Sequence, residues 1–381
     1  MFLEELEKIS KIFKSIVKEK NVKIIHHLDA DGISSAAIIA KMMLRENIGF
    51  EMRMVKQLTS EIIKELVISE KDFLIFLDLG SGQLKLLKEI LEATQVLILD
   101  HHEFAEMEHP NLFHLNPLLF AEEEISSSMI CYLFAKSVDL KNTDIVDLAI
   151  VGAVGDQMDE KWEFKGMAKK IIEEAENIGK VNTSKGIRLY GRSRPIHKAL
   201  ELSFDPFIPN ISGSESNAIQ FLSELGIELK ENNEWKRLAD LSIEEQQKIA
   251  SAIIIERLKA KHSDADDIFG DIYTISGRPE ELQDAREFAT ILNACGRLNK
   301  PDIGVKLCLN DIAALNASED VLSEYKRMIS EGISWIKDNK ESIRKTKFAT
   351  YIFCGDKIPS TLVGTITSIF LNSNLIDTGK P

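Results

Sequence analysis

Short apolar segments alternate with helix-like segments over the first hundred residues, and this rhythm is the feature that most constrains the fold. The apolar segments are VKIIHHL at 22–28, FEMRMV at 50–55, DFLIFLDL at 72–79 and TQVLILD at 94–100. Between them, SSAAIIAKMML, SEIIKELVI and QLKLLKEILE place apolar residues at helical spacing. Repeated strand–helix–strand units of this kind predict an α/β fold with a doubly wound, mostly parallel sheet.

The rest of the chain divides at changes of pattern. Helical patterns follow at 125–137, 143–154 and 166–178, and residues 180–215 are rich in Gly, Pro and Ser. A long helix is predicted over 242–261, followed by alternating strands and helices to the end. We therefore expect three parts: a first domain over 1–180, a linker and helical connector over 181–265, and a second, smaller α/β domain over 266–381.

Charge and composition restrict the class of function. The 381 residues contain 61 acidic and 47 basic side chains, a net charge of −14, which argues against binding nucleic acid through a broad basic face. A polyanionic substrate would have to be held by metal ions or by a confined basic strip. No apolar run reaches the roughly 18 to 20 residues that span a bilayer, and we expect a cytoplasmic protein. The four cysteines are far apart, which predicts buried thiols.

Acidic and imidazole side chains follow three of the predicted strands. The first strand leads into His27, Asp29 and Asp31, the third ends at Asp78, and the fourth ends at Asp100-His101-His102. A single strand-end Asp is often only a helix cap or turn residue. Several carboxylates converging at the carboxyl edge of one sheet would repel each other, and bound cations explain the pattern better.

A fourth segment, VGAVGDQ at 151–157, combines small residues with Asp156. The small residues would let this segment approach the other acids closely. A mixed set of carboxylates and imidazoles predicts Mn²⁺ or a similar transition metal, with Mg²⁺ as the alternative, rather than Ca²⁺. An EF-hand is excluded because Gly32 comes too early and no Glu closes a twelve-residue loop.

Together these segments resemble the four motifs of the DHH superfamily phosphoesterases: HLDADG, FLDLGSG, LDHH and VGAVGDQ, in that order. SKGIRLYGRSRPIHKAL, FDPFIPNISGSESNAIQFL and EFATILNACGRL are similar to segments of archaeal RecJ-like nucleases, relatives of bacterial RecJ and of the eukaryotic Cdc45 replication protein. The resemblance implies that 1–180 is a DHH catalytic domain and that 266–381 is part of a DHHA-type substrate-binding domain with an inserted helical segment.

The resemblance also implies a two-metal site. Asp29 and Asp31 would each bind one ion and Asp78 would bridge the two, with Asp156 and one of the motif's histidines, His101 or His102, completing the set. His27 is expected as a further ligand, with a hydrogen-bonding role as the alternative. We expect His101 as the ligand and His102 as the donor to a phosphate oxygen, although the motif does not distinguish them. Water activated by the ions would attack phosphorus.

Substrate contacts are expected from the most cationic stretch of the chain and from one later arginine. The stretch contains Arg188, Arg192, Arg194 and His197. A solvated basic linker is the alternative interpretation of this stretch. Arg297 follows Asn293-Ala294-Cys295-Gly296, where Gly296 is expected to cap a helix and Arg297 to contact substrate or to favour the helix end.

One departure from the family concerns the end of the chain. Related proteins usually close with consecutive glycines followed by His, and this sequence contains no adjacent glycine pair. It ends at DTGKP, over 377–381. We expect a truncated or shortened second domain.

Three functions are compatible with these residues. The first is a single-strand DNA or RNA exonuclease, for which the sequence does not encode the polarity of cleavage. The second is a replication-fork component that binds GINS and the replicative helicase, with or without catalysis. The third is a phosphoesterase acting on small nucleotides. The presence of all the expected ligands favours catalysis, and the long region between the domains favours a polynucleotide substrate.

Overall fold

The computed structural model describes residues 1–66, 68–159, 163–189, 191–203, 206–260, 262 and 264–372. The chain forms two compact units. Unit 1 comprises residues 1–182, 274–278 and 288–319, and unit 2 comprises residues 183–273, 279–287 and 320–381. We expect a truncated or shortened second domain from residues 377–381, and these residues lie outside the described ones.

Unit 1 is built on a parallel sheet of five strands: β1 (Asn21–His26), β2 (Phe50–Met54), β3 (Asp72–Leu77), β4 (Gln95–Leu99) and β5 (Leu112–Leu115). The strands lie in the order β2-β1-β3-β4-β5, and each neighbouring pair is parallel. The chain therefore runs outward in both directions from the middle of the sheet. The predicted α/β class with a doubly wound parallel sheet is confirmed.

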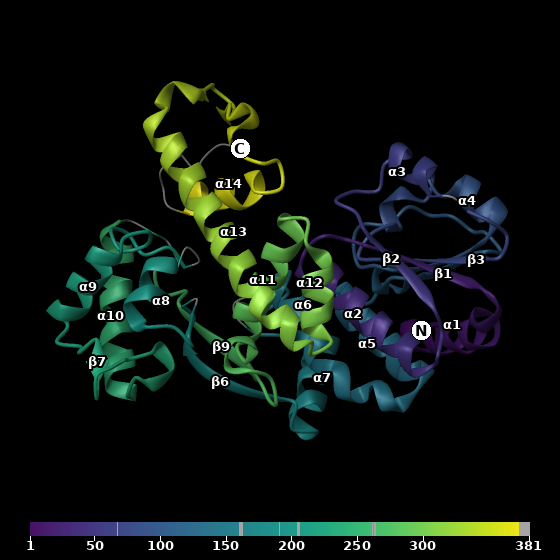
Figure 1. Cartoon of the computed structure of the whole chain (residues 1–381), viewed down its shortest axis with the longest axis horizontal. Helices are drawn as coiled ribbons and strands as arrows, with labels where there is room; N and C mark the ends of the chain where they lie inside the picture. The colour runs from purple at the N-terminus through teal and green to yellow at the C-terminus, as the bar shows by residue number, and fades with distance from the viewer. Residues whose placement is uncertain are drawn as a thin grey trace. The chain divides into compact units, whose positions relative to one another are not determined.

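Helices cover both faces of this sheet (Figure 1). On one face, α3 (Ser60–Glu65) and α4 (Lys88–Ala93) pack on alternate strand residues such as Ile25, Phe76 and Ile98. On the other face lie α1 (Phe2–Ile16), α2 (Ala30–Arg45) and α5 (Ser127–Val138). There the ring of Phe13 meets those of Phe73 and Phe134 nearly edge-on, at 5.6 and 5.3 Å. The strands are almost continuously apolar because helices bury both faces of the sheet.

Further helices of unit 1 pack against α2 or against each other. Helix α6 (Val146–Gly155) lies against α2 and α5, and α7 (Gly166–Asn177) follows it. The last part of α11 (Ala285–Arg297) and all of α12 (Pro301–Cys308) also belong to this unit, and α12 contacts α2. The buried Arg278 guanidinium donates to the carboxylate of Asp147 on α6, with distances of 2.9 and 2.6 Å.

Unit 2 has its own apolar core. It contains α8 (Ile196–Leu202), α9 (Glu215–Glu224), the short hairpin β7 (Lys230–Glu231) and β8 (Glu234–Trp235), and α10 (Ile243–Lys259). Ile196, Leu200, Leu222, Ile249 and Ile253 are among the buried residues of this core. The region 181–265, expected as a linker and helical connector, thus contains the packed helices α8, α9 and α10. Apolar residues recur at helical spacing even within its Gly- and Ser-rich part.

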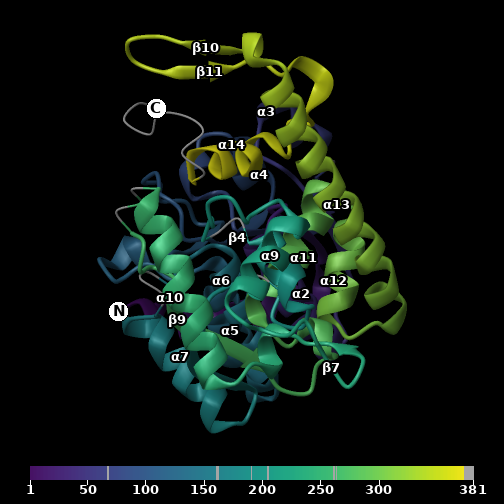
Figure 2. The same ribbon diagram turned by 90° about the vertical axis from the view of Figure 1, so that its left-hand side faces the viewer.

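The chain passes between the units within β6 (Val181–Ile187), within β9 (Phe269–Ile275), after Arg278, and within α11 and α13 (Ile312–Asp338). Strands β6 and β9 pair with each other. Beyond α13 come the hairpin of β10 (Ile343–Lys345) and β11 (Thr350–Ile352), and then α14 (Val363–Asn372) (Figure 2). The three functional domains proposed from sequence, including the incomplete last one, stay predictions. Among the described residues, none of the helices has the length and apolar character needed to cross a bilayer.

Candidate metal centre

The loop after β1 brings His27 and Asp29 together. Asp29 is the N-cap residue of α2, and its Oδ1 accepts a hydrogen bond of 3.0 Å from the backbone N–H of Gly32. Its Oδ2 lies 2.8 Å from Nδ1 of His27. A Cβ on Gly32 would lie 2.5 Å from the carbonyl oxygen of His27, so the tight turn requires glycine there. The capping role considered for Asp29 is therefore real, and it leaves the second carboxylate oxygen facing His27.

Asp31 is buried and is held by the first turn of α5. The backbone N–H groups of Ser127 and Ser128 donate to its two carboxylate oxygens at 2.7 and 3.0 Å. A carboxylate at a helix N-terminus is stabilised by these otherwise unpaired donors. Ser126 caps the same helix by accepting from the backbone N–H of Met129. The serine run at 126–128 was not identified as functional from sequence, and its only signal was a row of capping residues before an apolar helix.

Asp78 directly follows β3 and adopts a left-handed backbone conformation, with φ of 62°. Such a conformation is unfavourable for a residue with a side chain and persists where the surroundings impose it, often at functional sites. Its Oδ1 accepts from the Ser127 hydroxyl at 3.1 Å, and its Oδ2 lies 3.3 Å from Nδ1 of His27. The two carboxylate oxygens therefore face opposite parts of the centre.

The two histidines after β4 face different partners. Nδ1 of His102 lies 2.8 Å from Oδ1 of Asp100, whose Oδ2 accepts from the backbone N–H of Ser81. Nδ1 of His101 lies 2.9 Å from Glu124. The side chain of His101 is buried, whereas that of His102 is about half exposed. The Asp100 carboxylate therefore orients the His102 ring.

The other ring nitrogen of His101 points into the centre. Its Nε2 lies 3.5 Å from Oδ1 of Asp78 and 3.4 Å from Oδ2 of Asp156. The atom is buried and has no hydrogen-bond partner. A buried polar atom without a partner costs free energy unless a ligand or ion engages it.

Asp156 comes from the C-terminal end of α6, which approaches the centre closely. A Cβ on Gly152 would lie 2.6 Å from Oδ1 of Asp31, and one on Gly155 would lie 2.5 Å from Cβ of Ala30. The expectation that small residues let this segment approach the other acids is therefore confirmed.

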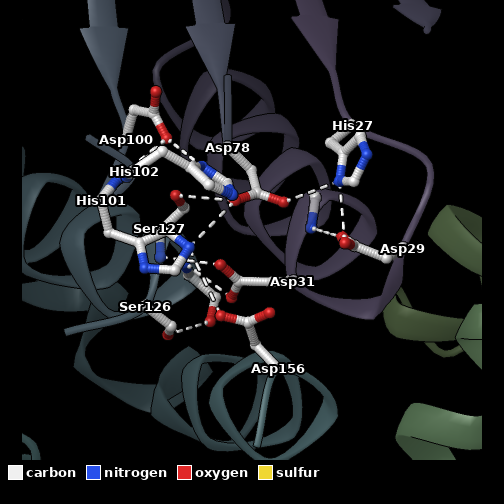
Figure 3. A network of polar contacts seen from close by, with 12 residues as sticks. His27, Asp29, Asp31, Asp78, Asp100, His101, His102, Ser126, Ser127 and Asp156 are labelled. Atoms are coloured by element: carbon white, nitrogen blue, oxygen red, sulfur yellow. Dashed lines mark hydrogen bonds and ion pairs between the residues drawn. The ribbon is translucent and has the colours of Figure 1, made fainter. Parts of the chain in front are cut away.

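The ligand atoms gather into three overlapping groups, each with its atoms within 4.8 Å of one another. One group joins residues from the β1 loop to Asp78, the second joins Asp31 to residues after β4 and α6, and the third joins Asp78 to both histidines. The groups are His27-Asp29-Asp78, Asp31-His101-Asp156 and Asp78-His101-His102. Figure 3 shows Asp78 between the first two groups, with His27 and Asp29 to one side and Asp31, His101 and Asp156 to the other.

The carboxylates of the second group resist being charged together. Burial, with repulsion from Asp78 and Asp156, holds the pKa of Asp31 well above its usual range. Burial also raises the pKa of Asp156 to about 6. Burial opposes protonation of His27, but the carboxylates of Asp29 and Asp78 outweigh it and raise its pKa to about 11. Bound protons on Asp31, Asp156 and His27 therefore offset part of the negative charge of the centre.

These residues fit a pair of divalent cations. The donor set contains carboxylate oxygens and imidazole nitrogens in two adjacent groups, which suits Mn²⁺ or a similar ion and also permits Mg²⁺. The unpartnered Nε2 of His101 lies among carboxylates, where an ion would engage it. Metal binding would displace protons from this set, because ligands must be deprotonated.

The residues expected to contact substrate lie in different units, with His102 and Arg297 in unit 1 and Arg188, Arg192, Arg194 and His197 in unit 2. Arg188 is buried, and its backbone N–H donates to the carbonyl of Ile268. His197 is also buried, and its ring contacts that of Trp235 at 4.6 Å. The side chains of Arg192 and Arg194 are partly exposed. The substrate-binding role of Arg188, Arg192, Arg194, His197, His102 and Arg297 stays a prediction.

The expectation that Gly296 caps a helix is wrong. Helix α11 continues to Arg297, and the left-handed residue beyond its end is Asn299, with φ of 57°. Gly296 lies inside the helix, and a Cβ there would fall 1.5 Å from the carbonyl oxygen of Leu28. Glycine is needed because α11 touches the loop that carries Asp29.

Comparisons with known proteins agree with this geometry. The model of the DHH family N-terminal domain matches residues 21–153, and that of the DHH-CID domain matches residues 189–268. An uncharacterised protein of Methanocaldococcus jannaschii is 31% identical over 97% of this chain and 82% of its own length.

Solved structures share the fold at low sequence identity. CDC45 from Entamoeba histolytica superposes with a TM-score of 0.71 and 12% identity, covering 98% of this chain and 84% of that one. RecJ from Thermus thermophilus in complex with Mn²⁺ superposes with a TM-score of 0.55 and 13% identity, covering 98% of this chain and 45% of that one. The chain belongs to the DHH family, and it shares its fold with CDC45 and RecJ.

Proposed function

We propose that this protein is a metal-dependent phosphodiesterase that removes nucleotides from single-stranded DNA or RNA as an exonuclease. The observation that carries the proposal is the position of Asp78, whose two carboxylate oxygens face two adjacent groups of ligands. A carboxylate shared in this way suits a two-ion phosphoesterase site.

His27, Asp29 and Asp78 would hold one divalent ion, and Asp31, His101 and Asp156 would hold the second, with Asp78 shared. Mn²⁺ is the preferred ion and Mg²⁺ the alternative, and a structure of RecJ bound to Mn²⁺ shares the fold. When bound, such ions acidify water and stabilise the charge that develops on the leaving oxygen. The chain supplies the ligands in a fixed arrangement, since Asp31 is held by two backbone N–H groups.

His102 is the proposed donor to the phosphate. Its Nδ1 faces Asp100, which fixes the ring and leaves Nε2 for a non-bridging oxygen of the substrate. His102 is more exposed than His101, as a residue that contacts substrate must be. The roles of the two histidines thus follow from their neighbours: Glu124 and the carboxylates for His101, Asp100 for His102.

Nucleic acid as the substrate rests on family membership and on the basic residues outside the ligand set. A chain of net charge −14 needs local cations to hold a polyanion. Arg192, Arg194 and Arg297 are the proposed contacts, with Arg188 and His197 as further members of the same stretch. Each contact to phosphate would be charge-assisted and sensitive to salt.

The test is digestion of end-labelled single-stranded DNA and RNA in Mn²⁺, in Mg²⁺ and in a chelator. Wild type, Asp29→Ala and Asp78→Ala are compared with Asp72→Asn, a change at the opposite end of β3. We expect stepwise shortening with the wild type and with Asp72→Asn, and none with the other two variants. Equal product from all four proteins would refute the catalytic assignment.

The same assay with pyrophosphate and cyclic dinucleotides distinguishes a polynucleotide exonuclease from a small-nucleotide phosphoesterase. Hydrolysis of those compounds, with intact polynucleotides left uncut, would transfer the proposal to the latter class.

A replication-fork role that depends on binding GINS is the second candidate, favoured by the shared fold with CDC45 along 98% of this chain. The complete ligand groups favour catalysis over a purely structural role. Co-elution with purified GINS, measured on the wild type and on the catalytically inactive Asp78→Ala variant, tests binding separately from hydrolysis.

A further inference from the structure

Asn293 contacts the backbone between the two motif aspartates. Its Oδ1 accepts a hydrogen bond of 3.0 Å from the backbone N–H of Ala30, although 263 positions separate the two residues in the chain. Ala30 is the first residue of α2 and lies between Asp29 and Asp31. N–H groups in the first turn of a helix have no acceptor within the helix. Asp29 provides an acceptor for Gly32, and Asn293 provides one for Ala30.

Gly296 touches the same loop on the other side of Asp29. It lies three residues after Asn293 on α11, and residues at that spacing share a helix face. A Cβ at Gly296 would fall 1.5 Å from the carbonyl oxygen of Leu28. Helix α11 therefore contacts the residue before Asp29 and the residue after it. All of these residues belong to unit 1.

The remaining anchors of the loop act on the aspartates themselves. The Asp31 carboxylate is fixed by α5, and the Asp29 carboxylate faces Gly32 and His27. The two carboxylates belong to different ligand groups, and Ala30 alone joins their backbones. The Ala30 peptide is therefore the backbone link between a ligand of one group and a ligand of the other.

We propose that Asn293 is a positioning residue of the metal centre: its acceptor oxygen fixes the Ala30 amide and so holds Asp29 in register with Asp31. This inference rests on the two-ion site of the proposed function. Residues that orient metal ligands typically contribute about 10- to 100-fold to metal affinity. We expect the ion held by His27, Asp29 and Asp78 to be the one affected, since Asp31 has its own anchor in α5.

The experiment compares Asn293→Leu, which has similar volume and no acceptor, with Asn293→Asp, which keeps an acceptor oxygen. The matched control is Asn111→Leu, because Asn111 is also partly buried in unit 1 and its side chain also bonds a backbone group, the carbonyl of Leu91, at 2.9 Å. Two readouts are taken on the full chain. Hydrogen exchange of the peptide containing Ala30 is measured without metal, and Mn²⁺ binding is measured by calorimetry.

We expect faster exchange at Ala30 and at least about 10-fold weaker binding of one Mn²⁺ in Asn293→Leu. Asn293→Asp and Asn111→Leu should keep wild-type exchange at this peptide and should bind both ions at least as tightly as wild type. If Asn293→Leu has a lower Tm than Asn111→Leu, then Asn293→Ala, which adds no bulky apolar group, replaces it.

Unchanged exchange and unchanged Mn²⁺ affinity in the variants without an acceptor would overturn the proposal. Equal losses in Asn293→Leu and Asn293→Asp would also overturn it, because the acceptor would then not be the cause. Failure of the proposed function would appear differently, as a wild-type protein that binds two ions and releases no nucleotide.

Discussion

Asp29 and Asp31 are separated by one residue, and their carboxylates join different ligand groups. Asp29 faces His27 and Asp78, whereas Asp31 faces His101 and Asp156. The backbone explains the divergence, because Asp29 is in an extended conformation, with φ of −84° and ψ of −175°, while Asp31 is already in the first turn of α2. A single strand-to-helix junction can therefore supply one ligand to each of two ions.

Replacing Asp78 should damage the centre more than any other single change of a ligand, because its carboxylate is the one proposed to be shared by the two ions. We expect Asp78→Asn to lower the rate of phosphodiester hydrolysis by more than about 100-fold and to reduce the number of bound Mn²⁺ ions. Steady-state kinetics and calorimetric titration measure the two effects.

The matched control for this change is Asp72→Asn. Asp72 is a buried acid at the opposite end of the same strand, where it pairs with Lys23 at 2.9 Å. We expect this variant to lose stability and to keep the Mn²⁺ stoichiometry of the wild type. If both variants bound two ions equally well, Asp78 could not be a shared ligand.

The sheet and the convergence of its strand ends could be predicted from the sequence. Strands β1, β3 and β4 are parallel neighbours, so the residues that follow them must meet at one edge. The approach of α6 could also be anticipated, because Gly152 and Gly155 leave room beside Asp31 and Ala30.

Contacts made by distant backbone groups could not be predicted in the same way. Ser127 and Ser128 bind the Asp31 carboxylate through their backbone N–H groups. Almost every residue has such a group, so the sequence does not distinguish these two. The bond between Asn293 and Ala30 joins helices far apart in the chain. In a sequence, a glycine near the end of a helical pattern indicates a helix cap. At Gly296 the true reason is the close approach of α11 to Leu28, and this approach depends on tertiary packing.

Adding one methyl group at Gly296 should destabilise unit 1. The Cβ of Gly296→Ala would lie 1.5 Å from a backbone carbonyl, so the helix or the loop must move. Overpacking of this kind costs about 1–3 kcal/mol. Urea unfolding measures the loss. The control is Gly49→Ala, where a Cβ meets no atom within 4 Å, and its unfolding free energy should change by less than about 0.5 kcal/mol. Equal stability of the two variants would contradict the close contact.

Arg278 should be essential to the packing of α6. Its guanidinium is buried and donates to Asp147, to the carbonyl of Cys308 and to Oδ1 of Asn310. Arg278→Met leaves the Asp147 carboxylate buried without this cation, and breaking such a pair costs about 3–5 kcal/mol. We expect the double variant Arg278→Met with Asp147→Leu to have a higher free energy of unfolding in urea than Arg278→Met alone. A double variant less stable than Arg278→Met would contradict the account.

His114 should make folding sensitive to acid. Nε2 of His114 lies 2.8 Å from the Ser81 hydroxyl, which also accepts a hydrogen bond from the Asn116 side-chain amide. Burial lowers the pKa of His114 to about 4 from its ordinary 6.5. Below pH 6.5 the unfolded chain therefore binds a proton that the folded protein does not, and this contribution to stability is lost as the pH falls toward 4.

The size of the effect is at most about 3 kcal/mol, from 1.36 kcal/mol for each pKa unit. We expect the unfolding free energy of His114→Gln, measured in chelator between pH 7 and pH 4, to fall less steeply than that of the wild type. Parallel curves for the two proteins would show that His114 is not responsible.

The basic stretch of unit 2 can be tested through the salt dependence of binding. If Arg192 and Arg194 each contact a phosphate, each substitution by Ala lowers by one the number of counterions that the DNA releases on binding. The slope of log affinity against log salt for single-stranded DNA should then become shallower by about 0.7 per change. The control is Arg327→Ala on α13 of the same unit, where the arginine is exposed and pairs with Glu331. Fluorescence anisotropy of a labelled oligonucleotide, with Asp78→Asn added to prevent cleavage, gives the slopes. An unchanged slope in both variants would leave the stretch as a solvated basic surface, whereas a change in only one would identify the arginine that contacts the phosphate backbone.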